Sequence, residues 1–206
     1  MTYLFQIIAL NKHRIIRGFW AGYGILVILF LAGGYSILTN NANSIFFYLA
    51  GKKLGDLASI TFCILLLPGI ARRFDIRHRW VSVIMWFRRQ LGISVFLLGI
   101  IHYLFVRGLP RIANGQAPLA SLARFELFGL AGLILLFPLF LTSNDASMRL
   151  LKKQWYTLHT LVYVVAWLIF GHVIFQRLSV WSAIVGIAAF AEIISHIYQY
   201  TKSRHN

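Results

Sequence analysis

Six long apolar stretches constrain this chain more than any other feature of its sequence. Each approaches the roughly 20 mainly apolar residues that a helix needs to cross a bilayer core about 30 Å thick. The stretches lie near residues 18–38, 54–71, 89–106, 125–141, 155–175 and 180–198. Hydrophobic residues make up 59% of the chain and charged residues 12%, and the mean hydropathy is +0.74. We therefore predict an all-α membrane protein, a six-transmembrane-helix bundle formed by one domain over residues 1–206.

The distribution of charge predicts the topology of this bundle. The chain has 20 Lys and Arg residues against five Asp and Glu, a formal net charge of +15. Cytoplasmic loops of membrane proteins are enriched in Lys and Arg. With the N-terminus in the cytoplasm, 14 of the 20 fall in inner segments and six in outer ones, so both termini are predicted to be cytoplasmic. Nucleic-acid binding would need a basic face on a soluble part of the protein, and the sequence supplies none.

Three histidines lie inside otherwise apolar stretches: His102 on the third span, and His159 and His172 on the fifth. An ionisable side chain within the bilayer is costly and indicates a function by default. A neutral imidazole is a common ligand of haem iron. This pattern favours a membrane cytochrome over the structural alternative, in which each histidine is a buried side chain bonded to a backbone carbonyl.

Two of these histidines are predicted to lie at the same depth. His102 precedes Arg107 by five residues and His172 precedes Arg177 by five, and both arginines are expected at the outer surface. At 1.5 Å per residue, each imidazole lies roughly 7 to 8 Å from its arginine. Two imidazoles at equal depth on different helices are what a haem with two histidine ligands requires.

His159 is expected about 20 Å deeper than His172, near the cytoplasmic side, where a second haem would complete a relay. On the third span the matching depth is that of Arg89, and Arg88 and Arg89 could pair with haem propionates or simply set the topology. His196 on the sixth span lies near the same depth as His159 and is a weaker candidate ligand.

The geometry of an ideal helix separates the two histidines of the fifth span by roughly 140°. Either the helix is distorted near Gly171, or His159 and His172 face different partners, which would suit His159 facing the sixth span or a cytoplasmic cofactor. Glu192, four residues before His196, could orient that imidazole, relay a proton or form an ordinary ion pair.

Two further patterns are interpreted as structural. Gly18-x-x-x-Gly22 and Gly51-x-x-x-Gly55 match the small-residue pattern of closely packed membrane helices. Glu126, at the start of the fourth span, favours a helix N-terminus.

The segments RRQLGISVFLLGIIHYL and LTSNDASMRLLKKQWYTLHTLVYVVAWLIFGHVIF, with the six-span layout, resemble the ferric reductase-like transmembrane domain family. In particular the chain resembles the compact bacterial members, the haem-binding membrane subunits of periplasmic methionine sulfoxide reductase systems (YedZ/MsrQ type). The resemblance is strongest over residues 54–175. It implies a multi-pass protein of the bacterial inner membrane.

What the resemblance implies for the site is a haem b protein in which His102, His172 and His159 bind the iron of one or two haems, with no catalytic residue. Larger members of the family carry a second histidine on the third span for an inner haem. That position lies near Arg88 and Arg89 here, which departs from the larger members and agrees with the compact ones.

The resemblance also implies the partners. Larger members carry C-terminal flavin and nicotinamide domains, whereas this chain ends at Asn206, just after the sixth span. We therefore expect a separate cytoplasmic flavin reductase as electron donor, and a periplasmic reductase or ferric iron as acceptor. Compact members are also associated with flavin mononucleotide (FMN), whose phosphate the basic segment 72–89 could hold, although no glycine-rich phosphate motif is present.

The predicted function is that of an oxidoreductase electron-transfer subunit that passes electrons from the cytoplasm to a periplasmic acceptor. Two alternatives remain open at this point. The first is a cytochrome b in which quinol replaces the soluble reductase. The second is a metal or proton transporter without haem, which predicts paired broken helices around a midplane site.

Overall fold

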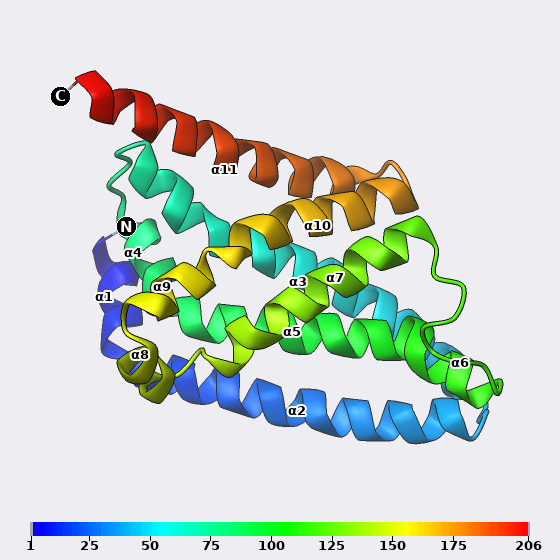
Figure 1. Ribbon diagram of the computed structural model, residues 1–206. Coiled ribbons are helices and arrows are strands. Elements are labelled where there is room, and N and C mark those ends of the chain that lie inside the picture. Colours follow the sequence, from blue (N-terminus) through cyan, green and yellow to red (C-terminus); the bar gives the residue numbers. More distant parts are fainter. Residues whose placement is uncertain (1, 206) are drawn as a thin grey trace.

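The computed structural model describes residues 2–205, which form α-helices and one π-helical turn without any strand (Figure 1). Six helical segments of this part of the chain are long and apolar enough to cross a membrane: Lys12–Leu38, Ser44–Arg73, Arg88–Ala113, Arg124–Leu141, Lys153–Gln176 and Val180–Arg204. The predicted all-helical fold with six candidate spans is therefore confirmed. The second helix begins at Ser44 rather than near residue 54, because it continues through Lys52 and Lys53.

The spans are built from the following elements. The first is α2 (Lys12–Leu38), the second α3 (Ser44–Arg73) and the fourth α7 (Arg124–Leu141). The third consists of α5 (Arg88–Tyr103), the π-helical turn η1 (Leu104–Gly108) and α6 (Leu109–Ala113). The fifth consists of α9 (Lys153–His159) and α10 (Leu161–Gln176), and the sixth is α11 (Val180–His205). Three short helices lie outside the spans: α1 (Thr2–Leu10), α4 (Arg79–Trp86) and α8 (Asp145–Leu151).

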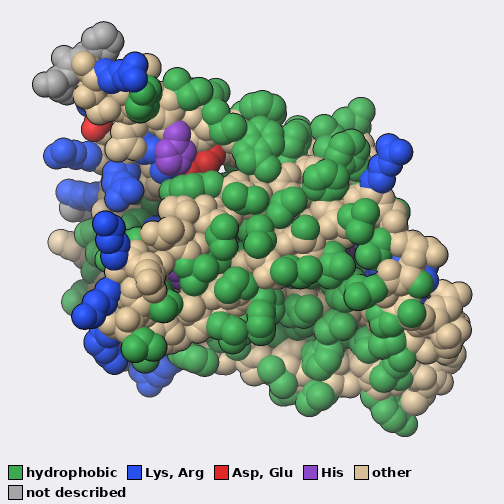
Figure 2. Space-filling model, in the orientation of Figure 1, with side chains coloured by type: hydrophobic (Ala, Val, Ile, Leu, Met, Phe, Trp, Pro, Cys, Tyr) green, Lys and Arg blue, Asp and Glu red, His purple; other side chains and the backbone are tan. Residues whose placement is uncertain are grey.

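The helices α2 and α11 lie at opposite edges of the bundle, with α3, α5, α7 and α10 between them (Figure 1). Both ends of the chain lie at the same end of the bundle, together with α1, α4 and α8 (Figure 1). Lys and Arg side chains gather at that end, while apolar side chains are spread over the rest of the face in view, among backbone and other side chains (Figure 2). This distribution is that of a bundle whose middle contacts lipid and whose basic end contacts water and headgroups.

The interior holds two clusters of buried apolar side chains. The larger one lies between α3, α5, α7, α10 and α11 and includes Phe62, Val95 and Val165. The smaller one surrounds Phe105, which has no exposed surface. Since lipid is as apolar as these side chains, close packing rather than the hydrophobic effect holds such helices together.

Only one of the two small-residue patterns lies at a close helix contact. Gly51 and Gly55 on α3 pack against the third span, Gly51 against Phe105 and Gly55 against the ring of His102. Gly18 and Gly22 have no neighbouring atom within 4 Å of the position that a Cβ would take. The interpretation as helix packing therefore fits the second span and not the first.

Two interruptions lie close to histidines. The fifth span is broken at Thr160, directly after His159, while α10 runs without a break through Gly171. The option of a distortion near Gly171 is therefore wrong, and the interruption lies beside His159 instead. The π-helical turn η1 begins two residues after His102, and such turns are frequent at functional sites.

Candidate functional site

The structure brings His102 and His172 together. His102 lies near the end of α5 and His172 lies on α10, and the centroids of the two imidazole rings are 6.2 Å apart. The ring planes are nearly perpendicular, at 79°. Two residues that are 70 positions apart in the sequence thus form one pair of facing imidazoles inside the bundle.

Hydrogen bonds fix the same tautomer in both rings. Nδ1 of His102 lies 2.9 Å from the carbonyl oxygen of Gly51, and Nδ1 of His172 lies 2.7 Å from that of Phe125. A carbonyl oxygen only accepts, so Nδ1 must carry the proton in each ring. The lone pair of each neutral ring is therefore on Nε2, which is the atom left to bind a metal. The structural alternative requires a hydrogen bond from each histidine to a backbone carbonyl, and this bond is present. The same bond leaves Nε2 free, as metal binding requires.

The distance between the rings is suited to one metal atom between them. Two metal–nitrogen bonds of about 2 Å, added to the distances from each nitrogen to its ring centre, give roughly 6 Å. Within residues 2–205, no group of three or more His, Cys, Asp or Glu side chains is arranged to hold a metal ion. The pair can thus supply two ligands to a metal whose remaining ligands come from elsewhere.

An ion pair lies on the side of this site where the loop between the third and fourth spans begins. Arg107, within η1, pairs with Glu126, and it also donates to the carbonyl oxygens of Ala120 at 2.8 Å and Ser121 at 3.1 Å. Glu126 accepts a hydrogen bond of 2.7 Å from the backbone of Ala123, which fits its expected place at a helix N-terminus. Arg107 therefore holds the loop close to the histidine pair, a role that its position as a surface charge did not predict.

His159 lies apart from this pair. Its ring stacks on Trp155 at 3.9 Å, and its Nε2 lies 3.1 Å from the hydroxyl oxygen of Thr142, at the end of α7. Trp155 donates to the carbonyl oxygen of the same threonine at 2.9 Å. The polar contact of His159 is thus with the fourth span and not with the sixth, where the sequence had suggested a partner.

The two arginines at the start of α5 are exposed. Arg89 pairs with Asp145 of α8 through both carboxylate oxygens, and Arg88 also lies at the surface. The hydrogen bond from Arg89 holds the pKa of the Asp145 carboxyl below its usual range. This ion pair connects α8 to α5 and gives Arg89 a structural role. The role predicted for Arg89 was a pairing with a haem propionate.

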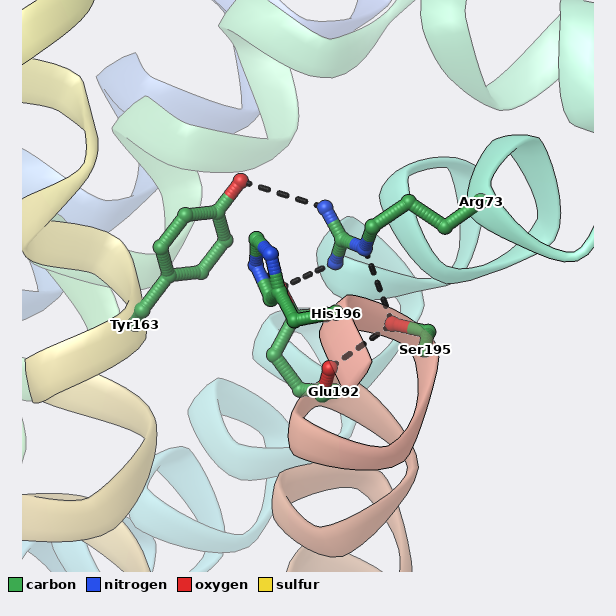
Figure 3. Close-up of polar contacts among 5 residues, drawn as sticks. All are labelled: Arg73, Tyr163, Glu192, Ser195 and His196. Carbon is green, nitrogen blue, oxygen red and sulfur yellow. Dashed lines mark hydrogen bonds and ion pairs between the residues drawn. The ribbon is translucent and has the colours of Figure 1, made fainter. Parts of the chain in front are cut away.

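A second polar cluster, which the sequence did not predict, lies where α3, α10 and α11 meet (Figure 3). Arg73, only 4% exposed, pairs with Glu192, donates to the hydroxyl of Ser195 at 2.8 Å and reaches the hydroxyl of Tyr163 at 3.4 Å. His196, the weaker candidate ligand, has Nε2 3.2 Å from a Glu192 oxygen and packs on Tyr163. Glu192 thus forms an ion pair with Arg73 and also contacts the imidazole of His196. Both the ion pair and a contact with that imidazole were among its predicted roles.

Arg73 adjoins Arg72 at the end of an apolar stretch, so the sequence alone predicts a loop charge at this position. A rotation of about 100° per residue places Arg72 outside and Arg73 inside the bundle. The one signal in the sequence was Glu192, since a buried carboxylate requires a partner.

Comparisons with known proteins agree with this architecture. The family described as "Ferric reductase like transmembrane component" matches residues 54–170. A protein-methionine-sulfoxide reductase heme-binding subunit MsrQ from Rhizobium meliloti is 42% identical over 82 residues, 39% of this chain and 38% of that protein. The MsrQ of Agrobacterium fabrum is 41% identical over 98 residues, 46% of this chain and 45% of its own length.

The chain spans about two fifths of the length of the curated relatives that it matches. No solved structure matches it. Since the family match covers more than half of the 206 residues, the chain belongs to the ferric reductase-like transmembrane component family.

Proposed function

We propose that this chain is a haem b electron-transfer subunit of the bacterial inner membrane, and that His102 and His172 are the residues that would hold the haem iron. The observation that carries the proposal is the pair of facing imidazoles, 6.2 Å apart, with both Nδ1 atoms hydrogen-bonded to backbone carbonyls. The matched MsrQ proteins are named heme-binding subunits, which supports the same cofactor.

The residues present fit a haem better than a bare metal ion. A transition-metal ion held by protein alone takes four to six protein or water ligands. The described part of the chain supplies two imidazoles here, and a porphyrin brings the other four nitrogens with its iron. Bound there, the haem would supply a metal that accepts and passes on one electron.

The chain's own residues determine the properties of this site. The carbonyl oxygens of Gly51 and Phe125 hold both Nδ1–H groups, so the rings present Nε2 in a fixed orientation. With both imidazoles bound to the iron, no position would remain for a substrate, which suits electron transfer. The apolar side chains around the pair exclude water and so help to set the reduction potential.

His159 is proposed as a ligand of a second haem nearer the basic end of the bundle. A ligand role for its Nε2 would require release of the Thr142 hydroxyl, which lies 3.1 Å away. Arg88 and Arg89 remain the proposed partners of propionates at that end, and Arg89 would then have to exchange Asp145 for the cofactor. His196 is a weaker candidate ligand of this haem, because its Nε2 contacts Glu192.

The direction of electron flow follows from the proposed topology, with both termini cytoplasmic. The basic end of the bundle would receive electrons from a cytoplasmic flavin reductase, and the opposite end would deliver them to a periplasmic reductase or to ferric iron. FMN is proposed as a further cofactor on the inner side. A cavity of about 320 Å³ lined by Phe5, Arg77, His78, Arg79 and Trp80 lies in the basic segment and supports that part of the proposal.

The transporter alternative is less well supported by the arrangement of the helices. It predicts broken helices that meet at one midplane site. The interruptions of the third and fifth spans lie toward opposite ends of the bundle, because η1 adjoins α6 and Thr160 adjoins α9, which are far apart along it (Figure 1).

Substitution of the two histidines tests the proposal. His102→Ala and His172→Ala should each lose haem, measured by pyridine haemochrome per purified chain, with His13→Ala as the matched exposed control. The proposal is wrong if both variants keep the haem content and spectrum of the parent protein.

The electron donor is tested in proteoliposomes. Reduction of the haem by a flavin reductase with NADH is compared with reduction by quinol. Reduction by quinol alone would contradict the soluble-reductase version and favour the quinol-linked cytochrome b.

A further inference from the structure

The two imidazoles of the facing pair are held in the same way by two different pairs of helices. His102 on α5 donates to the carbonyl oxygen of Gly51 on α3, and Gly55, four residues later, lies against its ring. His172 on α10 donates to the carbonyl oxygen of Phe125 on α7, and Gly129, again four residues later, lies against its ring. In each case the accepting carbonyl precedes a glycine by one helical turn.

The geometry of a helix explains why a glycine stands at this spacing. A helical carbonyl already accepts from the amide four residues later. At both sites the imidazole reaches the oxygen over that later residue, so a side chain on Gly55 or Gly129 would occupy the place of the ring. A Cβ built on Gly55 would lie 2.6 Å from Nδ1 of His102, and one on Gly129 would lie 2.6 Å from Nδ1 of His172. Neither distance is compatible with the imidazole in its present place.

We propose that Gly55 and Gly129 are positioning residues for the two haem ligands. Each leaves the space in which an imidazole can bond to the carbonyl one turn earlier, and this bond fixes Nε2 as the atom facing the iron. The inference rests on the proposed function, because it assigns a role toward the same haem. The role is more specific than the general packing of small residues between helices. Gly18 and Gly22 have the same four-residue spacing and no close neighbour, whereas Gly55 and Gly129 each lie against an imidazole.

The expected effect of Gly55→Ala or Gly129→Ala is a displaced imidazole and a weakened axial bond. Loss of a hydrogen bond that orients a metal ligand typically costs 10- to 100-fold in affinity for the metal group, so haem affinity should fall by about that factor. A loosened ligand also opens a coordination position. Part of the ferrous haem should therefore bind carbon monoxide, which the parent protein with two histidine ligands should not.

Two control variants separate this effect from others. Gly92→Ala, on the same helix as His102, adds a Cβ with nothing within 4 Å and should behave as the parent protein. Gly186→Ala places a Cβ 2.8 Å from the ring of Phe170, which lies two residues before His172 and so on the opposite side of α10. It strains the packing without touching either imidazole and should leave the carbon monoxide reactivity unchanged.

A double-mutant cycle keeps the test informative if Gly55→Ala folds poorly. Removal of the ring in His102→Gly removes the atoms that the new Cβ would meet. The loss of thermal stability caused by Gly55→Ala should therefore disappear in the His102→Gly background, because residues in contact are energetically coupled. An equal loss in both backgrounds would show that the alanine acts elsewhere and would overturn the inference.

The outcomes distinguish this inference from the proposed function. If the histidine variants lose haem while both glycine variants match Gly92→Ala in haem content and carbon monoxide binding, the inference is wrong and the function stands. The inference also fails if Gly186→Ala opens the haem as much as Gly55→Ala does. If the histidine variants retain haem, the proposed function itself fails.

Discussion

The buried ion pair between Arg73 and Glu192 allows a quantitative prediction. Glu192→Gln removes the negative charge and leaves the guanidinium without a counter-ion, since both side chains are almost fully buried, at 2% and 3% exposure. Removal of one partner of a buried pair typically costs about 3–5 kcal/mol of unfolding free energy. Arg73 would keep its hydrogen bond of 2.8 Å to Ser195, and the new amide oxygen can still accept. We therefore expect a loss near the lower end, about 3 kcal/mol.

Replacement of both charged residues should restore much of that loss. In the double variant Arg73→Met with Glu192→Met, no charge remains buried, and such replacements are often neutral or stabilising. Ser195 keeps its bond of 2.7 Å to the carbonyl oxygen of Glu192, and His196, half exposed, can be hydrated. The hydroxyl of Tyr163 loses its contact with Arg73, and that of Ser195 loses the donor of its bond of 2.8 Å.

The assay is unfolding in mixed micelles with a rising fraction of a denaturing detergent, followed by circular dichroism. Asp145→Asn is the matched control, because it breaks an ion pair with Arg89 that is exposed on both sides and should change stability little. The reasoning is refuted if Glu192→Gln is as stable as the parent protein, or if the double variant is less stable than either single one.

Three further predictions concern the ends of the bundle. Thr142→Val should leave the ring of His159 without its polar partner and increase its solvent exchange, measured by NMR of the labelled imidazole. Arg107→Gln should free the loop that its guanidinium holds and speed proteolysis there, while cleavage elsewhere stays unchanged. The hydrogen bond from Lys202 holds the pKa of the Asp75 carboxyl below its usual range, so this contact stabilises the fold above about pH 3.9 and is lost as the pH falls through the lower folded-state pKa. Lys202→Met should return the pKa of Asp75 to its usual range in a carboxyl NMR titration, and an unchanged value would contradict the assignment.

The number and nature of the helices could be predicted because a bilayer imposes a minimum length on each apolar stretch. All six stretches fall inside the six helical segments of the structure. The ends were less predictable. Lys52 and Lys53 precede the predicted second span, which begins near residue 54, whereas the helix α3 includes them with both side chains outside the bundle.

The facing pair was predictable for a similar reason, since depth along a helix is proportional to sequence distance. Residues five positions before an outer arginine on two spans would meet if the spans pack together, and the rings of His102 and His172 do lie 6.2 Å apart. What the sequence could not provide is rotation about each helix axis. That rotation turns Arg73 inward and places the ring of His159 against Thr142.

The spacing of glycine and carbonyl around the two histidines illustrates what a pattern alone leaves out. Gly18 and Gly51 begin the same four-residue pattern, yet only the second has a ring against its last glycine. Gly129 belongs to no such pattern and has the same role as Gly55. Which glycine meets an imidazole depends on which helices pack together, and this is information that only the structure holds.

We propose that His102 and His172 bind the iron of one haem b. The most direct test is a dithionite-reduced minus oxidised spectrum of the protein purified in mild detergent, with haem counted by pyridine haemochrome. The account predicts a low-spin b-type signal with at least one haem per chain, lost in His102→Ala and in His172→Ala. Absence of bound haem after haem-supplemented expression would contradict it and would favour the transporter alternative.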